Sequence, residues 1–128
     1  YKRGDYGAAQ QEWRPLAEGG NARAQKNMGV IYRQGRGVPQ DFAEAMRWYR
    51  RAAERGNAKA QFSLAHMYYE AQGVRQNYAE AAKWYRRAAE QGIALAQFSL
   101  GLMYYQGQGV PQDYEEAYRW WAKRGARR

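Results

Sequence analysis

Few side chains in this sequence have the types and spacing that catalysis or metal binding requires. The single histidine, His66, shares one face of a predicted helix with Ser63 and Glu70, at spacings of three and four residues. A nucleophile, a base and an orienting acid on one helix would barely reach hydrogen-bond distance, and no oxyanion donors accompany them. His66 and Glu70 alone are too few ligands for a structural zinc site. We therefore expect no catalytic residue, no metal site and no cofactor.

The helices that carry these residues come from a segment that the chain repeats. Gly-Val-Pro-Gln-Asp-Phe begins at residue 37, Gly-Val-Arg-Gln-Asn-Tyr at residue 73 and Gly-Val-Pro-Gln-Asp-Tyr at residue 109. This period of 36 residues is typical of a solenoid built from one supersecondary unit. The sequence predicts one domain over residues 1–128, made of a partial repeat at 1–20, repeat one at 21–56, repeat two at 57–92 and repeat three at 93–128.

The second half of each repeat predicts an amphipathic helix. Asp41, Asn77 and Asp113 occupy the N-cap position, and a glutamate three residues later completes the acidic form of a capping box. Apolar residues then recur at helical spacing. Gly56 and Gly92 follow as C-terminal stops. The partial repeat matches this second helix alone.

The first half of each repeat predicts another helix, antiparallel to the second because the loop between them is short. Asn21 and Asn57 can cap this helix, whereas Ile93 replaces the capping residue in repeat three. Its core side keeps one position small, as close helix approach requires, at Gly29, Ala65 and Gly101. The sequence thus predicts an all-α fold of stacked antiparallel helix pairs.

Four motifs recur at this period: Ala-x-Ala-Gln, Leu/Met-Gly/Ala-x-x-Tyr, Gly-Val-Pro-Gln-Asp-Tyr and Glu-Ala-x-x-Trp-Tyr-x-x-Ala-Ala. They cover about residues 5–124 and resemble the Sel-one-like repeat (SLR) family, which is related to tetratricopeptide repeats. The resemblance implies a right-handed α/α superhelical solenoid whose first helices line a concave surface. It also implies an adaptor: similar bacterial proteins are associated with envelope stress, secretion and cell-wall partners, and eukaryotic ones with protein quality control.

The face of each first helix opposite its core stripe carries the candidate binding residues. By the resemblance, this face lines the concave surface, with a cationic mouth in repeat one and an aromatic floor in repeats two and three. In repeat three the helix is apolar nearly all round, which is typical of a helix covered on both sides. The alternative is that these side chains pack against each other. The predicted partner-binding residues are Arg23, Lys26, Arg33, Lys59, Phe62, His66, Tyr69, Leu95, Phe98, Leu102 and Tyr105.

We expect a non-enzymatic protein–protein interaction scaffold that binds a peptide or protein segment on this face. Apolar side chains of the partner would lie on the aromatic residues, and its acidic groups would meet the cations. The alternative is a polyanion binder, for nucleic acid, anionic lipid or cell-envelope polysaccharide. The net charge is +9, and residues 21–56 carry eight basic and three acidic side chains. Nucleic acid is disfavoured because no aromatic–basic interleaving resembles a known module.

The remaining features concern the ends of the chain and its compartment. Cysteine is absent, which excludes disulfides and thiolate metal sites, and no apolar run is long enough to span a bilayer. The opening Tyr-Lys-Arg-Gly-Asp-Tyr resembles exported bacterial members and favours the periplasm or secretion over the cytoplasm. The start at Tyr1 suggests a piece of a longer protein, with residues 1–4 as the tail of a missing helix. After Trp120-Trp121 no further helix follows, so we expect either fraying or self-association there.

Overall fold

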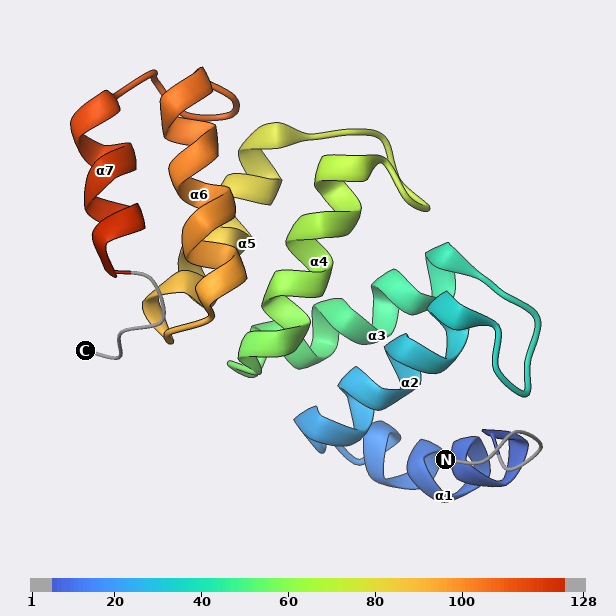
Figure 1. Ribbon diagram of the computed structural model, residues 1–128. Helices are drawn as coiled ribbons and strands as arrows, with labels where there is room; N and C mark the ends of the chain where they lie inside the picture. Colours follow the sequence, from blue (N-terminus) through green and yellow to red (C-terminus); the bar gives the residue numbers. More distant parts are fainter. Residues whose placement is uncertain (1–5, 124–128) are drawn as a thin grey trace. The chain divides into compact units, whose positions relative to one another are not determined.

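The structure is a computed structural model that describes residues 6–123, with side chains from residue 12, and helices are the only regular secondary structure over this range (Figure 1). This confirms the predicted all-α fold. The predicted helix remnant at residues 1–4 and the basic end at 124–128 lie outside the described residues. The helices are α1 (Tyr6–Glu18), α2 (Ala22–Gln34), α3 (Phe42–Glu54), α4 (Ala58–Glu70), α5 (Tyr78–Glu90), α6 (Ala94–Gln106) and α7 (Tyr114–Lys123).

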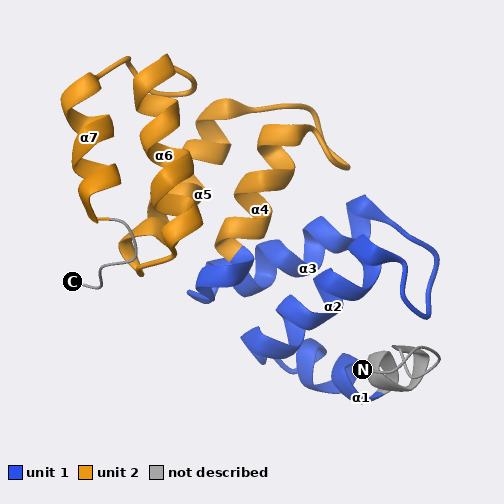
Figure 2. Cartoon of the chain, viewed as in Figure 1, with its two compact units in different colours: residues 1–60 blue, residues 61–128 orange. Residues whose placement is uncertain are grey.

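The chain divides into two compact units, residues 1–60 and 61–128 (Figure 2). In the first unit, α2 packs against both α1 and α3. In the second unit, α6 packs against both α5 and α7. Helices α2 and α6 are the first helices of repeats one and three. Each therefore lies between the second helix of the preceding repeat and the second helix of its own repeat.

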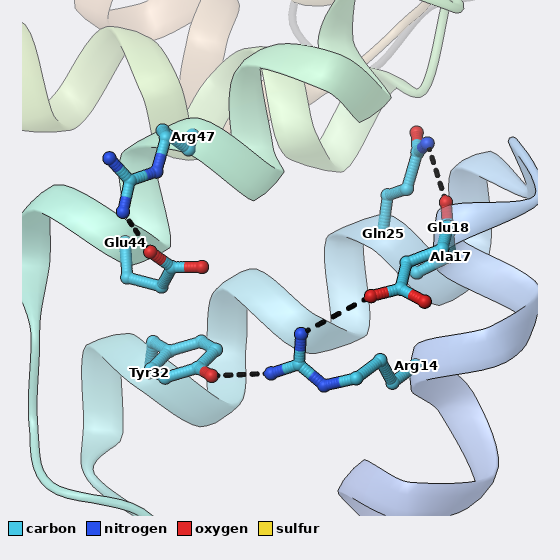
Figure 3. A network of polar contacts seen from close by, with 7 residues as sticks. All are labelled: Arg14, Ala17, Glu18, Gln25, Tyr32, Glu44 and Arg47. Carbon is cyan, nitrogen blue, oxygen red and sulfur yellow. Dashed lines mark hydrogen bonds and ion pairs between the residues drawn. The ribbon is translucent and has the colours of Figure 1, made fainter.

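The second helices begin at the predicted capping residues. The side-chain oxygens of Asp41, Asn77 and Asp113 each accept a hydrogen bond from the backbone N–H three residues later, at 3.0–3.1 Å. The reciprocal half of the predicted capping box takes a different form. The backbone N–H of Asp41 donates to the carbonyl of Tyr32, and Glu44 pairs with Arg47 instead (Figure 3). The same backbone bond joins Asn77 to Tyr68 and Asp113 to Tyr104, so it links the two helices of every repeat.

The first helices also begin as predicted. Asn21 and Asn57 accept hydrogen bonds from the backbone N–H groups of Ala24 and Ala60. Ile93 has nearly the same backbone angles as Asn21, φ −73° and ψ 110° against φ −74° and ψ 114°, but its side chain makes no capping bond. The backbone therefore adopts the cap conformation at Ile93 without the stabilisation that a capping side chain supplies.

A buried glutamine joins each of α2 and α6 to the helix before it. The Gln25 side-chain amide donates to the carbonyl of Ala17 at 3.0 Å (Figure 3), and Gln97 donates to the carbonyl of Ala89 at 3.0 Å. Both glutamines are only 1% exposed. Each buried amide nitrogen is satisfied because it bonds a carbonyl at the end of a neighbouring helix, whereas the Gln25 Oε1 has no hydrogen-bond partner among the described residues. These residues are the glutamines of the Ala-x-Ala-Gln motif.

Glycine on the first helix allows an aromatic ring of the second helix to approach closely, as predicted. A Cβ atom added at Gly29 would lie 2.7 Å from the Tyr49 ring, and one added at Gly101 would lie 2.3 Å from the Trp121 indole nitrogen. Trp121 is held in place because its indole N–H donates to the Phe98 carbonyl at 3.2 Å. Real side chains essentially never approach so closely, so these positions exclude any larger residue unless the ring moves.

The Gly101→Ala substitution tests this packing. Alanine in a helix is favoured over glycine by about 1 kcal/mol, but overpacking a well-packed contact typically costs about 1–3 kcal/mol. We expect a net loss of stability, measured as a lower urea midpoint and a shifted tryptophan emission. The double variant Gly101→Ala/Trp121→Tyr reproduces the Ala65 and Tyr85 residues of repeat two and should recover stability relative to Gly101→Ala. A single variant at least as stable as the parent would contradict the proposed steric limit.

Candidate binding surface

The outward face of α2 in the first unit carries cations without acidic partners. Among residues 12–123, Arg23, Lys26 and Arg33 form no ion pair, and neither does Lys59 at the start of α4. By contrast, Arg47, Arg50 and Arg119 on the second helices each pair with a glutamate on the same helix. The predicted cationic residues therefore differ from these arginines in having no acidic partner among the described residues.

Three of these cations lie near one another. Burial lowers the pKa of Lys26, and the positive charges of Lys59 and Arg23 lower it further. Lys26 also lines a pocket of about 250 Å³ between α1 and α2, together with Trp13, Asn27, Val30, Ile31, Gln34 and Arg36. The mutual repulsion means that a bound carboxylate or phosphate would be stabilised by several positive charges at once.

A cleft of about 160 Å³ opens between α4, α5 and α6 in the second unit. It is lined by His66, Tyr69, Glu70, Tyr85, Ser99 and Leu102. The cleft therefore brings together three of the predicted binding residues, His66, Tyr69 and Leu102, with three that were not predicted. Among these three, only Glu70 was considered from the sequence, as a candidate for catalysis or metal binding.

Tyr85 lies at the base of this cleft and is only 3% exposed. Burial raises the pKa of Tyr85 to about 12, the nearby Tyr69 and Glu70 raise it further, and a hydrogen bond with Ser99 opposes the shift. Tyr85 is thus a neutral phenol at physiological pH. The cleft combines one carboxylate with an imidazole, two phenol rings, a hydroxyl group and an aliphatic side chain.

The predicted aromatic residues of α4 are partly used in packing. The Phe62 ring lies 5.6 Å from the Tyr85 ring and 6.3 Å from the His66 ring, between centroids. Tyr69 packs against Tyr78 at 5.0 Å, and its hydroxyl donates to the Gln108 side chain at 2.9 Å. Phe62, His66 and Tyr69 are all half-buried. In repeat two, then, the alternative of mutual packing describes these side chains better than an open aromatic floor.

The predicted aromatic residues of α6 are exposed instead. Leu95 is 64% exposed, Phe98 45% and Tyr105 40%, so this helix is not covered on both sides within the described residues. Tyr105 packs against Tyr114 at 4.9 Å and against Trp121 at 5.7 Å, and Trp121 also contacts Phe98 and Tyr118. We call this set the aromatic surface; it comprises Leu95, Phe98, Tyr105, Tyr114, Tyr118 and Trp121.

Sequence reasoning missed the part of the aromatic surface that α7 contributes. Tyr114 and Tyr118 are more than half exposed. The predicted self-association residue Trp120 is instead buried at 4% exposure, with Lys123 over its ring at 4.4 Å. The available signal was position: Trp120 follows Trp48 and Trp84 at the 36-residue period, and both of these are also buried. Any contact made by the Trp120-Trp121 doublet would have to come from Trp121, which is half-buried.

The cleft contains two of the three residues that were considered for catalysis or metal binding. His66 and Glu70 line the cleft, but Ser63 is not among its lining residues. No group of three or more His, Asp or Glu side chains within the described part of the chain could hold a metal ion. Likewise, none of the helices described is long and apolar enough to cross a bilayer.

Comparisons with known proteins identify one family. The Sel1 repeat model matches residues 22–57, 58–93 and 94–123, each starting one residue after the predicted repeat. A protective antigen of uropathogenic Escherichia coli displaying an SLR fold is 45% identical, with a TM-score of 0.84 over 87% of this chain. A Sel1 repeat protein from Oxalobacter formigenes is 42% identical, with a TM-score of 0.86 over 89%. The matches span only 24% and 47% of those two chains. A search of curated proteins finds no match.

The buried phenol of Tyr85 predicts a specific loss of stability at high pH. Its pKa is about 12 in the folded state, against roughly 10 in an unfolded chain. The folded state binds this proton more tightly, so the contribution is fully present below the unfolded pKa and is lost as the pH rises through the folded one. Two pH units correspond to roughly 2–3 kcal/mol.

We therefore expect the free energy of unfolding to fall more steeply between these two pKa values in the parent protein than in Tyr85→Phe. Urea unfolding at a series of pH values measures this difference, with Tyr118→Phe, an exposed tyrosine, as the matched control. Parallel pH profiles for the parent and Tyr85→Phe would show that Tyr85 titrates as it does in the unfolded chain.

Proposed function

The chain belongs to the Sel1 repeat family, and we propose that it binds a peptide or protein segment on the outward faces of α2, α4 and α6. Sel1 repeat proteins are generally scaffolds for protein interactions and are typically non-catalytic. The observation that supports this particular binding face most strongly is the aromatic surface of the second unit. The chain spans less than half of the length of either similar structure. The kind of partner that it binds is therefore proposed from its own residues.

The aromatic surface has the composition of a protein-binding site. Contiguous exposed apolar residues are uncommon on proteins without partners, and tyrosine and tryptophan are enriched at binding hot spots. Their rings offer a large contact area with few rotatable bonds, so little conformational entropy is lost on binding. Phe98 and Tyr105 are exposed while resting on Trp121, which keeps both rings in place before a partner arrives.

The unpaired cations of the first unit indicate the charge of the partner. Arg23, Lys26 and Arg33 form no ion pair within residues 12–123, and Lys26 is partly desolvated among like charges. An acidic side chain on the bound segment would relieve this repulsion. A segment bound on the first unit is therefore expected to carry carboxylates, and one bound on the second unit to carry apolar side chains.

A polyanion is the second candidate ligand, and the distribution of charge favours it. Residues 1–60 carry twelve basic and six acidic side chains, whereas residues 61–123 carry six of each. The surplus is thus concentrated in the first unit and in the last five residues. This candidate ranks lower because it gives no role to the aromatic surface.

Truncation of the aromatic surface tests the proposed function. Peptides selected from a random display library against the parent protein serve as probes, and their affinity is measured by fluorescence anisotropy. The double variant Phe98→Ala/Tyr105→Ala should weaken binding by about 30-fold or more, since hot-spot aromatics contribute about 2 kcal/mol or more. The melting temperature should change little, because both side chains are largely exposed. Leu16→Ala, an exposed apolar truncation in the first unit, is the matched control.

Equal affinity for the parent and the double variant, together with a lower melting temperature, would assign Phe98 and Tyr105 to packing rather than binding.

Salt dependence separates the two candidate ligands. Binding through phosphate contacts loses affinity steeply between about 50 and 200 mM salt because counterions are released. We expect the selected peptides to show a shallow salt dependence and a single-stranded DNA oligonucleotide to bind weakly throughout. Lys26→Gln/Arg33→Gln should reduce any DNA binding further. Tight DNA binding that weakens steeply with salt would favour a polyanion, rather than a peptide, as the ligand.

A further inference from the structure

The cleft between α4, α5 and α6 has a chemistry that differs from both the aromatic surface and the cationic face. Resting on the proposed function, we propose that this cleft binds a cationic side chain, arginine or lysine, of the bound segment. Glu70 would pair with the cation, and the Tyr69 and Tyr85 rings would line its apolar stem.

Glu70 is the one acidic side chain among the residues that line the cleft. Glu70 forms no ion pair with any residue of the described chain. The glutamates of the second helices differ, since Glu44, Glu80 and Glu116 are each paired with a base three residues later. A cationic group of a ligand in the cleft could therefore pair with this carboxylate.

Four basic residues of the second unit make contacts away from the cleft. Arg86 donates to the Tyr104 hydroxyl, while Lys83 and Arg87 lie over the Trp84 ring at 5.2 and 4.7 Å. Lys123 lies over Trp120. These contacts hold the side chains of the second helices in place, and none of these four residues lines the cleft. The cation that Glu70 lacks would then come from a ligand.

The walls of the cleft suit a flat or slender cationic group. Aromatic faces attract cations, and arginine stacks on them while its two N–H groups bind a carboxylate. The Ser99 hydroxyl and the Tyr85 phenol add hydrogen-bonding groups at the base. The volume of about 160 Å³ exceeds the space that a single water molecule needs. A guanidinium group therefore has both room and partners.

Titration with amino-acid amides tests the cleft without any peptide. Nitrogen-15 spectra of the full chain are recorded with Nα-acetyl-arginine amide, Nα-acetyl-lysine amide and the neutral isostere Nα-acetyl-citrulline amide. We expect saturable shifts at Glu70, Ser99 and Leu102 with arginine, weaker ones with lysine and none with citrulline. Glu70→Gln should weaken arginine binding about tenfold, as expected for loss of a charge-assisted pair. Glu115→Gln, which removes an exposed carboxylate of α7 without a partner, should leave binding unchanged.

Equal shifts with citrulline, equal affinity of Glu70→Gln, or no saturable shift at the cleft would each overturn the proposal. The proposed function fails separately, because it depends on peptide binding by the aromatic surface. An arginine titration that persists in Phe98→Ala/Tyr105→Ala would show that the cleft binds its cation independently of that surface. Glu70 has no ion pair and is exposed, so Glu70→Gln should keep the parent melting temperature, and a change in affinity would report on binding alone.

Discussion

The approach of an aromatic ring to a helix position without a side chain fixes the geometry within a repeat. Tyr49 lies on Gly29 and Trp121 lies on Gly101, at distances that leave no room for a Cβ atom. A backbone hydrogen bond also joins the two helices near the loop that connects them, from the N–H of each second-helix N-cap residue to a tyrosine carbonyl of the first helix. With both contacts in place, the rotation of the first helix about its axis is fixed. The residues opposite its core stripe must then face away from its partner helix, whatever their chemical type.

This fixed rotation lets the outward face vary in chemistry without cost to the core. The core positions 28, 64 and 100 are fully buried apolar residues in every repeat, while the outward positions range from cations in α2 to aromatic residues in α6. The second helices carry their charges differently, since their bases either pair with glutamates or lie over buried tryptophans. The basic side chains of α2 that form no ion pair, Arg23, Lys26 and Arg33, therefore remain available to a ligand.

The period predicted the fold better than it predicted the site. Capping residues, glycine stops and small residues recur at the same positions of each repeat, where a local hydrogen bond or a steric limit requires them. The structure of one repeat therefore largely predicted that of the others. At the outward positions, exposure does not follow from the period, because it depends on which neighbouring element covers a residue. Phe62 packs against Tyr85 and is half-buried, whereas Phe98, at the same repeat position, is 45% exposed. The contribution of α7 was missed for this reason, as was the cleft, which requires side chains from three helices.

Tyr69 and Tyr105 show how one position acquires two roles. Each packs against the tyrosine nine residues later at nearly the same distance, 5.0 and 4.9 Å, so the ring pair itself is a structural element of the repeat. The Tyr69 hydroxyl also donates to Gln108, a residue of the loop after α6, and Tyr69 lines the cleft. The Tyr105 hydroxyl has no such partner among the described residues, and its ring is exposed while it packs against Trp121. The ring pair has similar geometry in both repeats. Tyr69, which is half-buried, lines a polar cleft, whereas Tyr105, which is exposed, forms part of an apolar surface. Two kinds of binding site can thus arise from one repeated side chain, with no change in the helix that carries it.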